Sequence, residues 1–380
     1  MVLFLHNRYR TTGGEERVVE DLVALVRDRL GEHVELLMRD SAGLGAPRAA
    51  AGLLRGGLDE REVADAVRRS GARIVHAHNL LPTLGWRALA AAKEAGARVV
   101  LHLHQYRLVC AVGVCFTEGA DCTRCHGRDT TPGIRHNCRG DRAEALTYAA
   151  SLSLWQRRLC SLADAVVVPS RFAEQRLREL GAPLPAGTVS VLPPPVALAG
   201  SEDGSEQSPV PGDGHALVVA RLAPEKGIDV AIEACRLARV PLVVAGDGPE
   251  LGRLRALAAG ADVRFEGRVG RERLAELRAG ASIGLVPSRS AETFGIAAAE
   301  AMAAGLPVAA SRVGALPELV DENSLITAGD ARALAGAIER LAGDEQAGQQ
   351  GRRRVAELCA PGNVAARLAS IYQQAFSRAE

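Results

Sequence analysis

The sequence predicts an α/β protein built from two doubly wound parallel sheets. Short apolar runs alternate with amphipathic helical patterns such as residues 15–30, which is typical of parallel strands covered by helices on both faces. A polar stretch at residues 201–214 separates two such series. The length of 380 residues also exceeds one ordinary hydrophobic core and suits two domains.

The first series predicts an N-terminal domain over residues 1–195. It ends at three consecutive prolines, residues 193–195. A cysteine-rich insertion at residues 108–140 follows its fourth strand and interrupts the alternation. The strands expected in this domain are residues 2–6, 33–38, 73–77, 97–103, 164–168 and 188–192.

The second series predicts a C-terminal domain over residues 215–360. The linker before it, residues 196–214, is rich in Gly, Ser, Pro and acidic residues and has no apolar period. A last helix is expected over residues 361–380, after a Pro-Gly pair. The strands expected in this domain are 215–220, 241–245, 263–267, 282–287 and 307–310, and the helices are 228–238, 249–259, 271–279 and 295–304.

The composition excludes several classes of protein. Basic and acidic side chains number 46 and 45, so a formal charge of +1 offers no general attraction to nucleic acid. Aromatic residues make up 3% of the chain, which argues against a platform for stacking bases. The apolar start at residues 2–6 is too short for a signal peptide, and no apolar run has the length of a transmembrane segment. We therefore expect a cytoplasmic protein, with peripheral contact at the inner face of the membrane left open.

Four charged residues follow strands of the C-terminal domain. Arg221 and Lys226 follow its first strand, and Glu292 and Glu300 follow its fourth. Ligands of such sheets bind beyond the carboxyl ends of the strands, where two cations suit a diphosphate and two carboxylates suit hydroxyl groups. Lys226 is one of two lysines, with Lys93, among 46 basic side chains, which suggests that its position requires a compact ammonium. The pattern predicts a site for a sugar nucleotide.

Taken in order, these motifs resemble the retaining glycosyltransferases of family 4, the glycosyl transferases group 1. In the C-terminal domain the resemblance rests on Arg221 to Lys226, GDGPE at 246–250, the turn Gly267–Val269 and the segment 287–300. The later motifs AAGLPV and GALPELV follow in the same order. In the N-terminal domain NRYRTTGGEERVVE, HAHN and LHLHQYRLVC each follow a strand and are also similar to the family. The resemblance covers nearly the whole chain.

The resemblance implies a GT-B fold, in which two Rossmann-like doubly wound domains face a cleft. It implies transfer of a sugar from a nucleoside-diphosphate sugar, with UDP expected before GDP, to an acceptor hydroxyl. The acceptor would be a saccharide or a lipid-linked glycan, in glycan or exopolysaccharide assembly. Configuration would be retained by attack on the front face, with the leaving phosphate accepting the acceptor proton, so that catalysis requires no metal or other cofactor.

The same resemblance assigns roles to single residues. Arg221, Lys226, Glu292 and His104 are expected to be catalytic, since fixed cations stabilise the charge that grows on a leaving diphosphate. A glycine at the start of a helix allows phosphate or sugar to approach free backbone N–H groups. Glu300, inside a helix, would accept both ribose hydroxyls. The residues expected to bind the donor are Gly13, Gly14, Gly246, Gly248, Arg268, Val269, Phe294, Gly295 and Glu300.

Two histidines share one face of the fourth strand by period two. The resemblance implies that His104 contacts the donor sugar near its anomeric carbon, although Gln105 stands where the family has Asp or Asn. For His102 the favoured interpretation is a buried, hydrogen-bonded side chain. An inverting reaction would instead need a general base in the N-terminal domain, and His104 remains a candidate for that role.

Five of the eight cysteines cluster between residues 110 and 138, with His126 and His136 nearby. A C-x2-C pair with flanking cysteines in a cytosolic protein indicates metal before disulfide. Four thiolates suit a structural Zn²⁺, and a metal would supply the stability that this polar, glycine-rich stretch lacks. An iron–sulfur cluster and unligated or redox-active thiols are the alternatives. The four expected ligands are Cys110, Cys122, Cys125 and Cys138.

Rival functions also fit parts of the sequence. GDGPELG at 246–252 matches a loose dinucleotide fingerprint and would indicate an NAD-dependent oxidoreductase, although that function gives Arg221 and Lys226 no task. A non-catalytic protein that binds sugar nucleotides would keep the donor site and lack an acceptor pocket. An epimerase or a sugar phosphate synthase of GT-B fold would differ in its acceptor.

Overall fold

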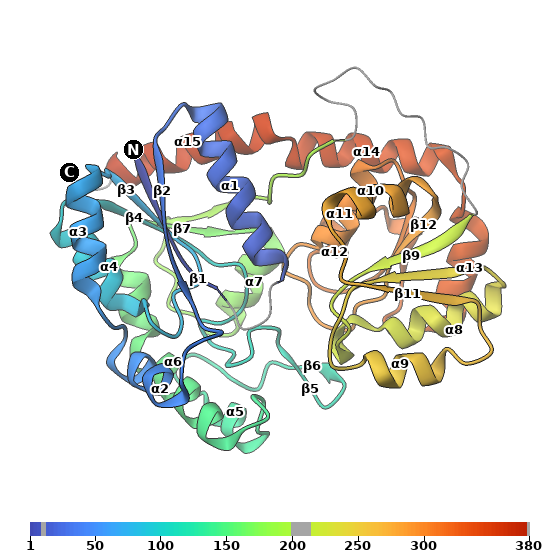
Figure 1. Cartoon of the computed structure of the whole chain (residues 1–380), viewed down its shortest axis with the longest axis horizontal. Helices are drawn as coiled ribbons and strands as arrows, with labels where there is room; N and C mark the ends of the chain where they lie inside the picture. The colour runs from blue at the N-terminus through green and yellow to red at the C-terminus, as the bar shows by residue number, and fades with distance from the viewer. Residues whose placement is uncertain (9–12, 199–213, 378–380) are drawn as a thin grey trace. The chain divides into compact units, whose positions relative to one another are not determined.

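The computed structural model describes residues 1–8, 13–198 and 214–377, and these residues form two compact units (Figure 1). Unit 1 comprises Met1–Thr117, Cys122–Pro195 and Pro361–Glu380, and unit 2 comprises Val196–Ala360 with Glu118–Asp121. Each unit contains one six-stranded parallel sheet with helices packed on it, which confirms the predicted fold class. Most of the predicted linker, residues 199–213, lies outside the described residues.

In the sheet of unit 1, the first strand of the chain lies between two other strands and not at an edge. All of its neighbouring strands pair in parallel, and their central residues are apolar and buried, as expected for a sheet covered on both sides. The strands in spatial order are β2 (Val34–Asp40), β1 (Val2–Arg8), β3 (Ile74–Ala77), β4 (Arg98–His102), β7 (Ala165–Val168) and β8 (Val189–Val191).

Helices cover both faces of this sheet. One face carries α1 (Gly14–Leu30) and α15 (Pro361–Ser377), and the other carries α3 (Glu60–Ser70) and α4 (Gly85–Glu94) (Figure 1). The other elements of unit 1 and its insertion are α2 (Ala46–Arg55), β5 (Phe116–Thr117), β6 (Ala120–Asp121), α5 (Thr131–Arg135), α6 (Arg142–Leu162) and α7 (Arg171–Glu179).

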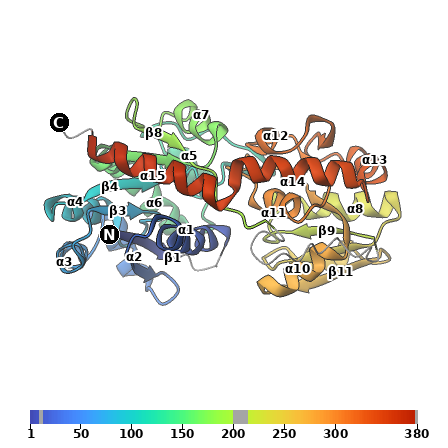
Figure 2. The same ribbon diagram turned by 90° about the horizontal axis from the view of Figure 1, so that it is seen from above.

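The last helix, α15, belongs to unit 1 although it comes from the far end of the chain. It packs against α1, β4 and β7, and Figures 1 and 2 show it beside α1. Its buried side chains recur with helical spacing and form one apolar stripe toward the sheet. They are Val364, Ala365, Leu368, Ile371, Tyr372 and Ala375.

The sheet of unit 2 separates two hydrophobic cores. Helices α8 (Ile228–Ala238), α9 (Leu251–Leu257) and α13 (Ala331–Leu341) pack into one core. Helices α10 (Arg271–Ala279), α11 (Ile296–Ala303), α12 (Leu316–Leu319) and α14 (Glu345–Cys359) pack into the other. The strands in spatial order are β11 (Val263–Gly267), β10 (Leu242–Ala245), β9 (His215–Val219), β12 (Ala281–Val286), β13 (Val308–Ser311) and β14 (Leu325–Ile326). Two short 3₁₀ segments are η1 (Pro224–Lys226) and η2 (Glu322–Ser324).

Two helices of unit 2 are shorter than the sequence predicts. The helix expected at 295–304 is α11, which begins at Ile296 because Gly295 has a φ of +97° and lies outside helical conformation. The helix expected at 249–259 is α9, which begins at Leu251, after the turn that contains Pro249, and ends before Gly260, whose φ is +75°.

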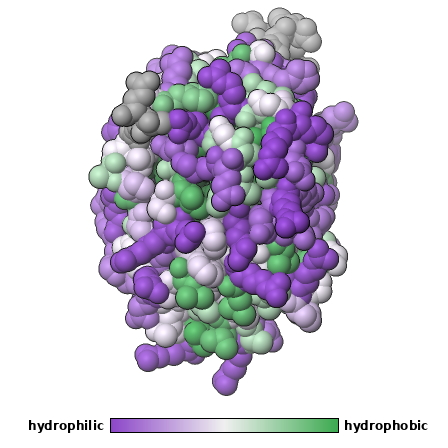
Figure 3. All heavy atoms as spheres, turned by 90° about the vertical axis from the view of Figure 1, so that its left-hand side faces the viewer, coloured by the Kyte–Doolittle hydropathy of each residue, from purple (hydrophilic) through white to green (hydrophobic). Residues whose placement is uncertain are grey.

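No helix in the described ranges is long and apolar enough to cross a membrane. The face in Figure 3 is mostly hydrophilic, with apolar side chains in smaller groups between charged ones. Scattered apolar exposure of this kind is ordinary for a protein surface in contact with water.

Candidate functional site

Two loops of unit 2 meet where the strand order of its sheet reverses. β9 has β10 on one side and β12 on the other, so the chain crosses the sheet between them. The loop after β9 carries Arg221 and Lys226, and the loop after β12 carries Glu292. The carboxyl ends of adjacent parallel strands lie at the same edge of a sheet, and such a switch point is where ligands bind in these folds.

Lys226 and Glu292 are in direct contact. Lys226 Nζ donates a hydrogen bond to Glu292 Oε1 at 2.6 Å, and the Ser288 hydroxyl donates to the same oxygen at 2.6 Å. Burial by itself would raise the pKa of Glu292, but the Lys226 ammonium and the two hydrogen bonds lower that pKa below its usual value. Glu292 is therefore an ionised carboxylate held in one position.

Arg221 is held by a carboxylate that the sequence analysis did not identify. Its guanidinium forms an ion pair with Glu225, whose side chain is only 7% exposed, while half of the Arg221 side chain is exposed. The backbone carbonyl of Glu225 also accepts hydrogen bonds from the N–H groups of Arg289 and Ser290, at 2.8 and 3.3 Å. Glu225 thus fixes Arg221 and joins the loop after β9 to the loop after β12.

A second ion pair joins the same two loops. Arg289 donates two hydrogen bonds to the carboxylate of Asp229, at 2.8 and 2.9 Å. Gly227, with a φ of +65°, lies directly against the backbone carbonyl of Pro287, so a side chain at this position would collide with it. These contacts hold the charged side chains in place before any ligand binds, as preorganised electrostatic sites require.

Glu300 lies on α11, one helical turn beyond Gly295. Its carboxylate forms an ion pair with Arg278 of α10, and both side chains are about 15% exposed or less. Gly295 precedes the free N–H groups of α11, the end of a helix that favours anionic groups. Phe294 is buried in the hydrophobic core of unit 2, so its side chain packs and only its backbone lies at the helix start.

The other predicted donor-binding residues lie in neighbouring loops. Gly246 and Gly248 follow β10, and their Cα atoms face the backbone carbonyls of Ala220 and Leu222 so closely that no side chain fits. Arg268 follows β11 and is exposed, and Val269 packs partly against the core. The two glycines thus allow the loops after β9 and β10 to lie side by side.

Unit 1 contains a row of histidines at the carboxyl ends of β3 and β4, in which His76, His78 and His102 are buried and His104 is half-buried. His76 bonds to the Tyr372 hydroxyl of α15 at 2.8 Å and to His102 at 3.2 Å, and His78 bonds to His104 at 2.8 Å. The rings of His102 and His104 are stacked, with centroids 4.2 Å apart. His102 is buried and hydrogen bonded, as the sequence analysis expects.

The histidines of this row are neutral at neutral pH. Burial lowers the pKa of His104 and that of His76 to about 3. His6, at the end of β1, has a pKa of about 4 because burial lowers it more than Glu15 raises it. Their rings act as uncharged hydrogen-bonding groups.

The start of α1 is acidic. The Gly13 N–H donates to the Glu16 carboxylate at 2.7 Å, and the Gln105 amide donates to Glu15 at 2.9 Å. Two carboxylates beside Gly13 and Gly14 disfavour a phosphate there and suit uncharged hydroxyl groups. Gln105, the departure from the family pattern, therefore positions Glu15.

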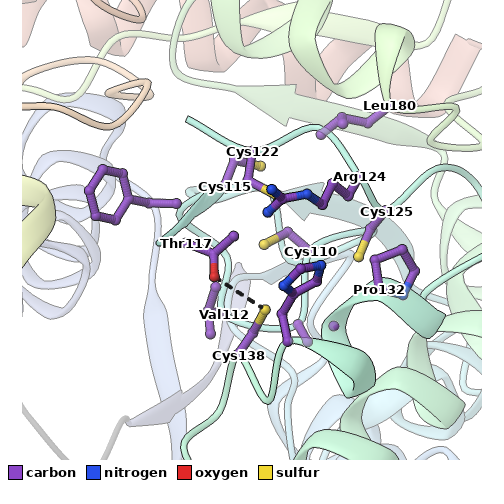
Figure 4. Close-up of a pocket in the computed structure, with 14 residues that line it drawn as sticks. Cys110, Val112, Cys115, Thr117, Cys122, Arg124, Cys125, Pro132, Cys138 and Leu180 are labelled. Atoms are coloured by element: carbon purple, nitrogen blue, oxygen red, sulfur yellow. Dashed lines mark hydrogen bonds between the residues drawn. The ribbon is translucent and has the colours of Figure 1, made fainter. Parts of the chain in front are cut away.

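The four predicted metal ligands line one cavity in unit 1 (Figure 4). Cys110, Cys122, Cys125 and Cys138 contribute to its wall, and the volume open to the centre of a water molecule is about 20 Å³. All eight cysteines of the chain are free thiols. Among the described residues, the three-ligand group with donor atoms within 4.8 Å of one another is instead His76, His78 and His102.

Two family models match the chain, one in each unit. The family described as "Glycosyl transferase 4-like domain" matches residues 7–195, and the family described as "Glycosyl transferases group 1" matches residues 214–344. The chain belongs to the GT-B glycosyltransferases. The second match spans Arg221, Lys226, Glu292 and Glu300, and the first spans His104.

Curated glycosyltransferases are similar to parts of the chain. "MMP alpha-(1->4)-mannosyltransferase" of Mycolicibacterium hassiacum is 32% identical over 183 residues, which cover 46% of this chain and 42% of that protein. "Amylovoran biosynthesis glycosyltransferase AmsK" of Erwinia amylovora is 36% identical over 146 residues, covering 34% and 36%. The chain thus spans about two fifths of the length of each of these two relatives.

A solved structure shares the fold over nearly the full length of the chain. HepE of Anabaena, solved in complex with UDP and glucose, superposes with a TM-score of 0.65 and 18% identity, covering 98% of this chain and 99% of that one. At this identity the likeness concerns the fold. It agrees with the assignment of this glycosyltransferase to the GT-B fold.

The sequence analysis missed the residues that orient the predicted ones. Ser288 and Glu225 hold Glu292 and Arg221, Arg278 holds Glu300, and Tyr372 bonds to the histidine row. Glu225 and Ser288 lie inside the motifs at 221–226 and 287–300, so their place in the sequence is a signal that could have identified them. Arg278 and Tyr372 carry no motif, because their contacts depend on how distant elements pack.

Proposed function

We propose that the protein transfers a sugar from a nucleoside-diphosphate sugar to an acceptor hydroxyl, with UDP as the expected nucleotide. The observation that carries this proposal is the Lys226–Glu292 ion pair beside Arg221, at the switch point between β9 and β12. Two cations and an ionised carboxylate match a ligand that has a diphosphate at one end and hydroxyl groups at the other. UDP is favoured because HepE, which shares the fold, was solved with UDP.

The reaction we propose retains the configuration of the sugar. The bond between the anomeric carbon and the diphosphate oxygen breaks, and its electron pair stays on that oxygen. Arg221 and Lys226 stabilise the charge that develops there. The acceptor oxygen forms a bond to the same face of the anomeric carbon, and its proton passes to the leaving phosphate oxygen. Glu292 would bind sugar hydroxyls.

The low pKa of His104 supports this route over an inverting one. A general base works best when its pKa is near the working pH, and burial holds the pKa of His104 at about 3. A neutral imidazole of such low basicity suits a hydrogen bond to a sugar hydroxyl. We therefore propose that His104 positions the donor sugar, and that Gly13 and Gly14 allow hydroxyl groups close to the backbone.

The oxidoreductase alternative has less support. The glycines of GDGPELG lie against the carbonyls of Ala220 and Leu222, which gives them a packing role that needs no pyrophosphate. The helix that follows, α9, has seven residues and so offers a weak dipole for a dinucleotide. The acidic start of α1 is a second feature that suits a sugar better than a phosphate.

For the acceptor we propose a saccharide or a lipid-linked glycan in the assembly of a cell-envelope or extracellular polysaccharide. The similarity to an amylovoran biosynthesis enzyme supports this class. The proposed place of action is the cytoplasm, with peripheral contact at the inner face of the membrane when the acceptor is lipid-linked.

Thermal stabilisation by free nucleotides tests the proposal. UDP, GDP, ADP, NAD and their sugar conjugates are added to the wild type, to Glu300→Ala and to the control Glu339→Ala on α13. A ligand at a hundredfold excess over its dissociation constant adds about 2.7 kcal/mol of stability. We expect one nucleoside diphosphate to stabilise the wild type and the control by this amount, and Glu300→Ala by only about 1 kcal/mol or less. Stabilisation by NAD alone, or by nothing, would refute the proposed function.

A further inference from the structure

The insertion between β4 and α6 lacks a hydrophobic core of its own from Phe116 onward, whereas Tyr106, Leu108, Val109 and Ala111 before that point are buried. From Phe116 to Glu144, a stretch that the structure describes without gaps, no apolar side chain is buried. Its only buried residues are Thr130 and Gly133. Regular structure here is limited to the short ribbon of β5 and β6 and to five residues of α5. A segment that lacks apolar burial needs another source of free energy to offset the entropy of ordering it.

Thiol groups gather where that core is missing. Five of the eight cysteines and His136 line the same cavity, and Figure 4 shows sulfur atoms on different sides of it. A volume of about 20 Å³ open to a water centre has room for one small ion or water. The five cysteines are Cys110, Cys115, Cys122, Cys125 and Cys138.

Polar groups around the cavity are arranged to stabilise negative sulfur. The Cys115 thiol and the backbone N–H groups of Val112, Gly113 and Cys115 form hydrogen bonds to Cys110 Sγ. The Gly133 N–H donates to Cys125. Hydrogen bonds of this kind orient thiolate ligands around bound metals.

Two side chains add to this second layer. The Arg124 guanidinium lies 4.0 Å from Cys122 Sγ, and the Thr117 hydroxyl lies 4.0 Å from Cys138 Sγ. Arg124 would also offset part of the negative charge of a thiolate cluster. Each of the four predicted ligand thiols thus has its own hydrogen-bonding partner.

Exposure separates four of the five thiols from the fifth. Cys110, Cys122, Cys125 and Cys138 are partly buried at the wall of the cavity, whereas Cys115 is fully buried. The four partly buried thiols are therefore the ones placed to bind an ion in the cavity.

Cys115 differs from the other four thiols. Its side chain is 1% exposed, its thiol bonds to Cys110, and its carbonyl accepts a hydrogen bond from the Cys122 N–H at 2.8 Å. It lies behind Cys110 as a supporting group rather than as a ligand. This difference makes it a useful internal control.

The histidine group at β3 and β4 is a weaker metal candidate. His76, His78 and His102 are the closest-spaced group among the described residues, but His76 already bonds to Tyr372 and to His102, and His78 bonds to His104. A metal held by His76 and His102 would have to replace the bond between them. The thiols of Cys122, Cys125 and Cys138 lie in the part of the insertion without buried apolar side chains, so they can move toward Cys110 without disrupting a core.

We propose that Cys110, Cys122, Cys125 and Cys138 bind one Zn²⁺ in a tetrahedral, structural site that holds the insertion on unit 1. Zinc fits because four thiolates in tetrahedral arrangement are a closed structural zinc site. Binding draws the sulfur atoms to about 2.3 Å from the metal and releases the remaining thiol protons. The site takes no part in the proposed sugar transfer and does not depend on that proposal.

Metal analysis of untagged protein from zinc-supplemented cells is the first test. We expect about one zinc per chain, and X-ray absorption that shows four sulfur neighbours. The double variant Cys122→Ser/Cys125→Ser should lose the zinc, while Cys115→Ala and the buried control Cys160→Ala in α6 should keep it. Less than about 0.2 zinc per chain in the wild type, or iron in its place, would overturn the proposal. Three sulfurs and one nitrogen would overturn the four-cysteine ligand set.

A second measurement covers the case in which the double variant does not fold. Wild-type protein is treated with a zinc chelator, and hydrogen exchange is compared between residues 116–141 and the strands β1 and β3. Loss of zinc should remove protection from the insertion and leave the strands protected, with recovery on adding zinc alone. Unchanged protection of the insertion after the metal has been removed would contradict a structural role.

Discussion

The Lys226 ammonium lies 2.6 Å from Glu292 Oε1, although the two residues are 66 positions apart and follow different strands. The contact exists because β9 and β12 are neighbours in the sheet and both end at the same edge. It places a cation and an ionised carboxylate side by side, held by Ser288 and by the backbone bonds between the two loops. The proposed donor site is therefore formed before a ligand arrives.

Replacing Lys226 tests the cation of this pair. Lys226→Ala should weaken nucleotide binding by roughly 2 kcal/mol, about 30-fold, because charged hydrogen bonds to the diphosphate are lost. Lys226→Arg should restore little, since a planar guanidinium does not replace a compact ammonium. Titration calorimetry with the nucleotide found by thermal stabilisation measures the loss.

The other lysine of the chain is the matched control. Lys93 pairs with Asp164 in unit 1, and Lys93→Ala removes an ion pair of the same chemistry. It should leave nucleotide affinity unchanged. If Lys226→Ala bound the nucleotide as tightly as the wild type, Lys226 would not belong to the donor site.

Glu300 and Arg278 should differ in how strongly they affect binding. Glu300→Ala removes the proposed ribose ligand and should cost roughly 2 kcal/mol of nucleotide affinity. Arg278→Ala removes only the group that orients Glu300, so nucleotide affinity should fall by about 1 kcal/mol or less. The turnover of bound substrate should not change. Calorimetry and initial rates separate the two effects.

Arg273, on the same helix as Arg278, is the control for this pair. It bonds to Glu276 and Glu266 on the surface, so Arg273→Ala should change neither quantity. If Arg278→Ala reduced turnover as severely as Glu300→Ala reduces binding, Arg278 would have to contact the substrate itself.

The histidine row predicts loss of stability in mild acid. An unfolded histidine has a pKa near 6.5, whereas burial lowers the folded pKa of His6 to about 4 and those of His76 and His104 to about 3. Below about pH 6.5 the unfolded chain binds more protons than the folded one, so the free energy of unfolding falls as the pH falls toward 4. Each such histidine contributes up to about 1.4 kcal/mol per pH unit.

Urea denaturation between pH 8 and about pH 4 measures this slope. His78→Asn should make the pH dependence shallower, because burial keeps the pKa of His78 well below its usual value. His33→Asn, at an exposed position before β2, should leave the slope as in the wild type. A wild-type stability that stays constant from pH 6.5 to pH 4.5 would contradict the buried, neutral state of the row.

Tyr372 links the C-terminal helix to this row. Tyr372→Phe removes a hydroxyl that bonds to His76 at 2.8 Å in a buried setting, and should lower the free energy of unfolding by about 1–3 kcal/mol. Tyr148→Phe is the control, since the Tyr148 ring packs beneath Arg139 and its hydroxyl has no hydrogen bond within the described structure. Equal effects of the two substitutions in urea denaturation would show that the His76 bond adds nothing.

Much of the fold could be predicted from local patterns of apolar and turn residues in the sequence. The helices α8 and α10 begin and end where the sequence predicts, at 228–238 and 271–279. The observed strand boundaries agree with the predicted ones within a residue or two, because an apolar run between polar turns indicates a buried strand directly. Strand β14 was missed since two residues give no period, and α11 was placed one residue too early because the conformation of Gly295 is not visible in its identity.

The candidate site was predictable in part. Arg221, Lys226 and Glu292 could be found because each follows a strand, and parallel strands bring such positions to one edge of a sheet. Arg278 could not be found, because it is one of 44 arginines and only the packing of α10 on α11 brings it to Glu300. Which four of the five clustered cysteines are partly exposed at the cavity wall likewise depends on loop geometry.

By itself, the sequence determined that this chain forms two parallel-sheet units and which charged residues stand at the ends of their strands. Hydrophobic periodicity and turn residues carry that information, since burial and backbone conformation are local properties. Only the tertiary structure decided that Lys226 meets Glu292, that Arg278 meets Glu300 and that Tyr372 of the last helix meets His76. Contacts between distant segments depend on strand order and helix packing, and no local pattern encodes either.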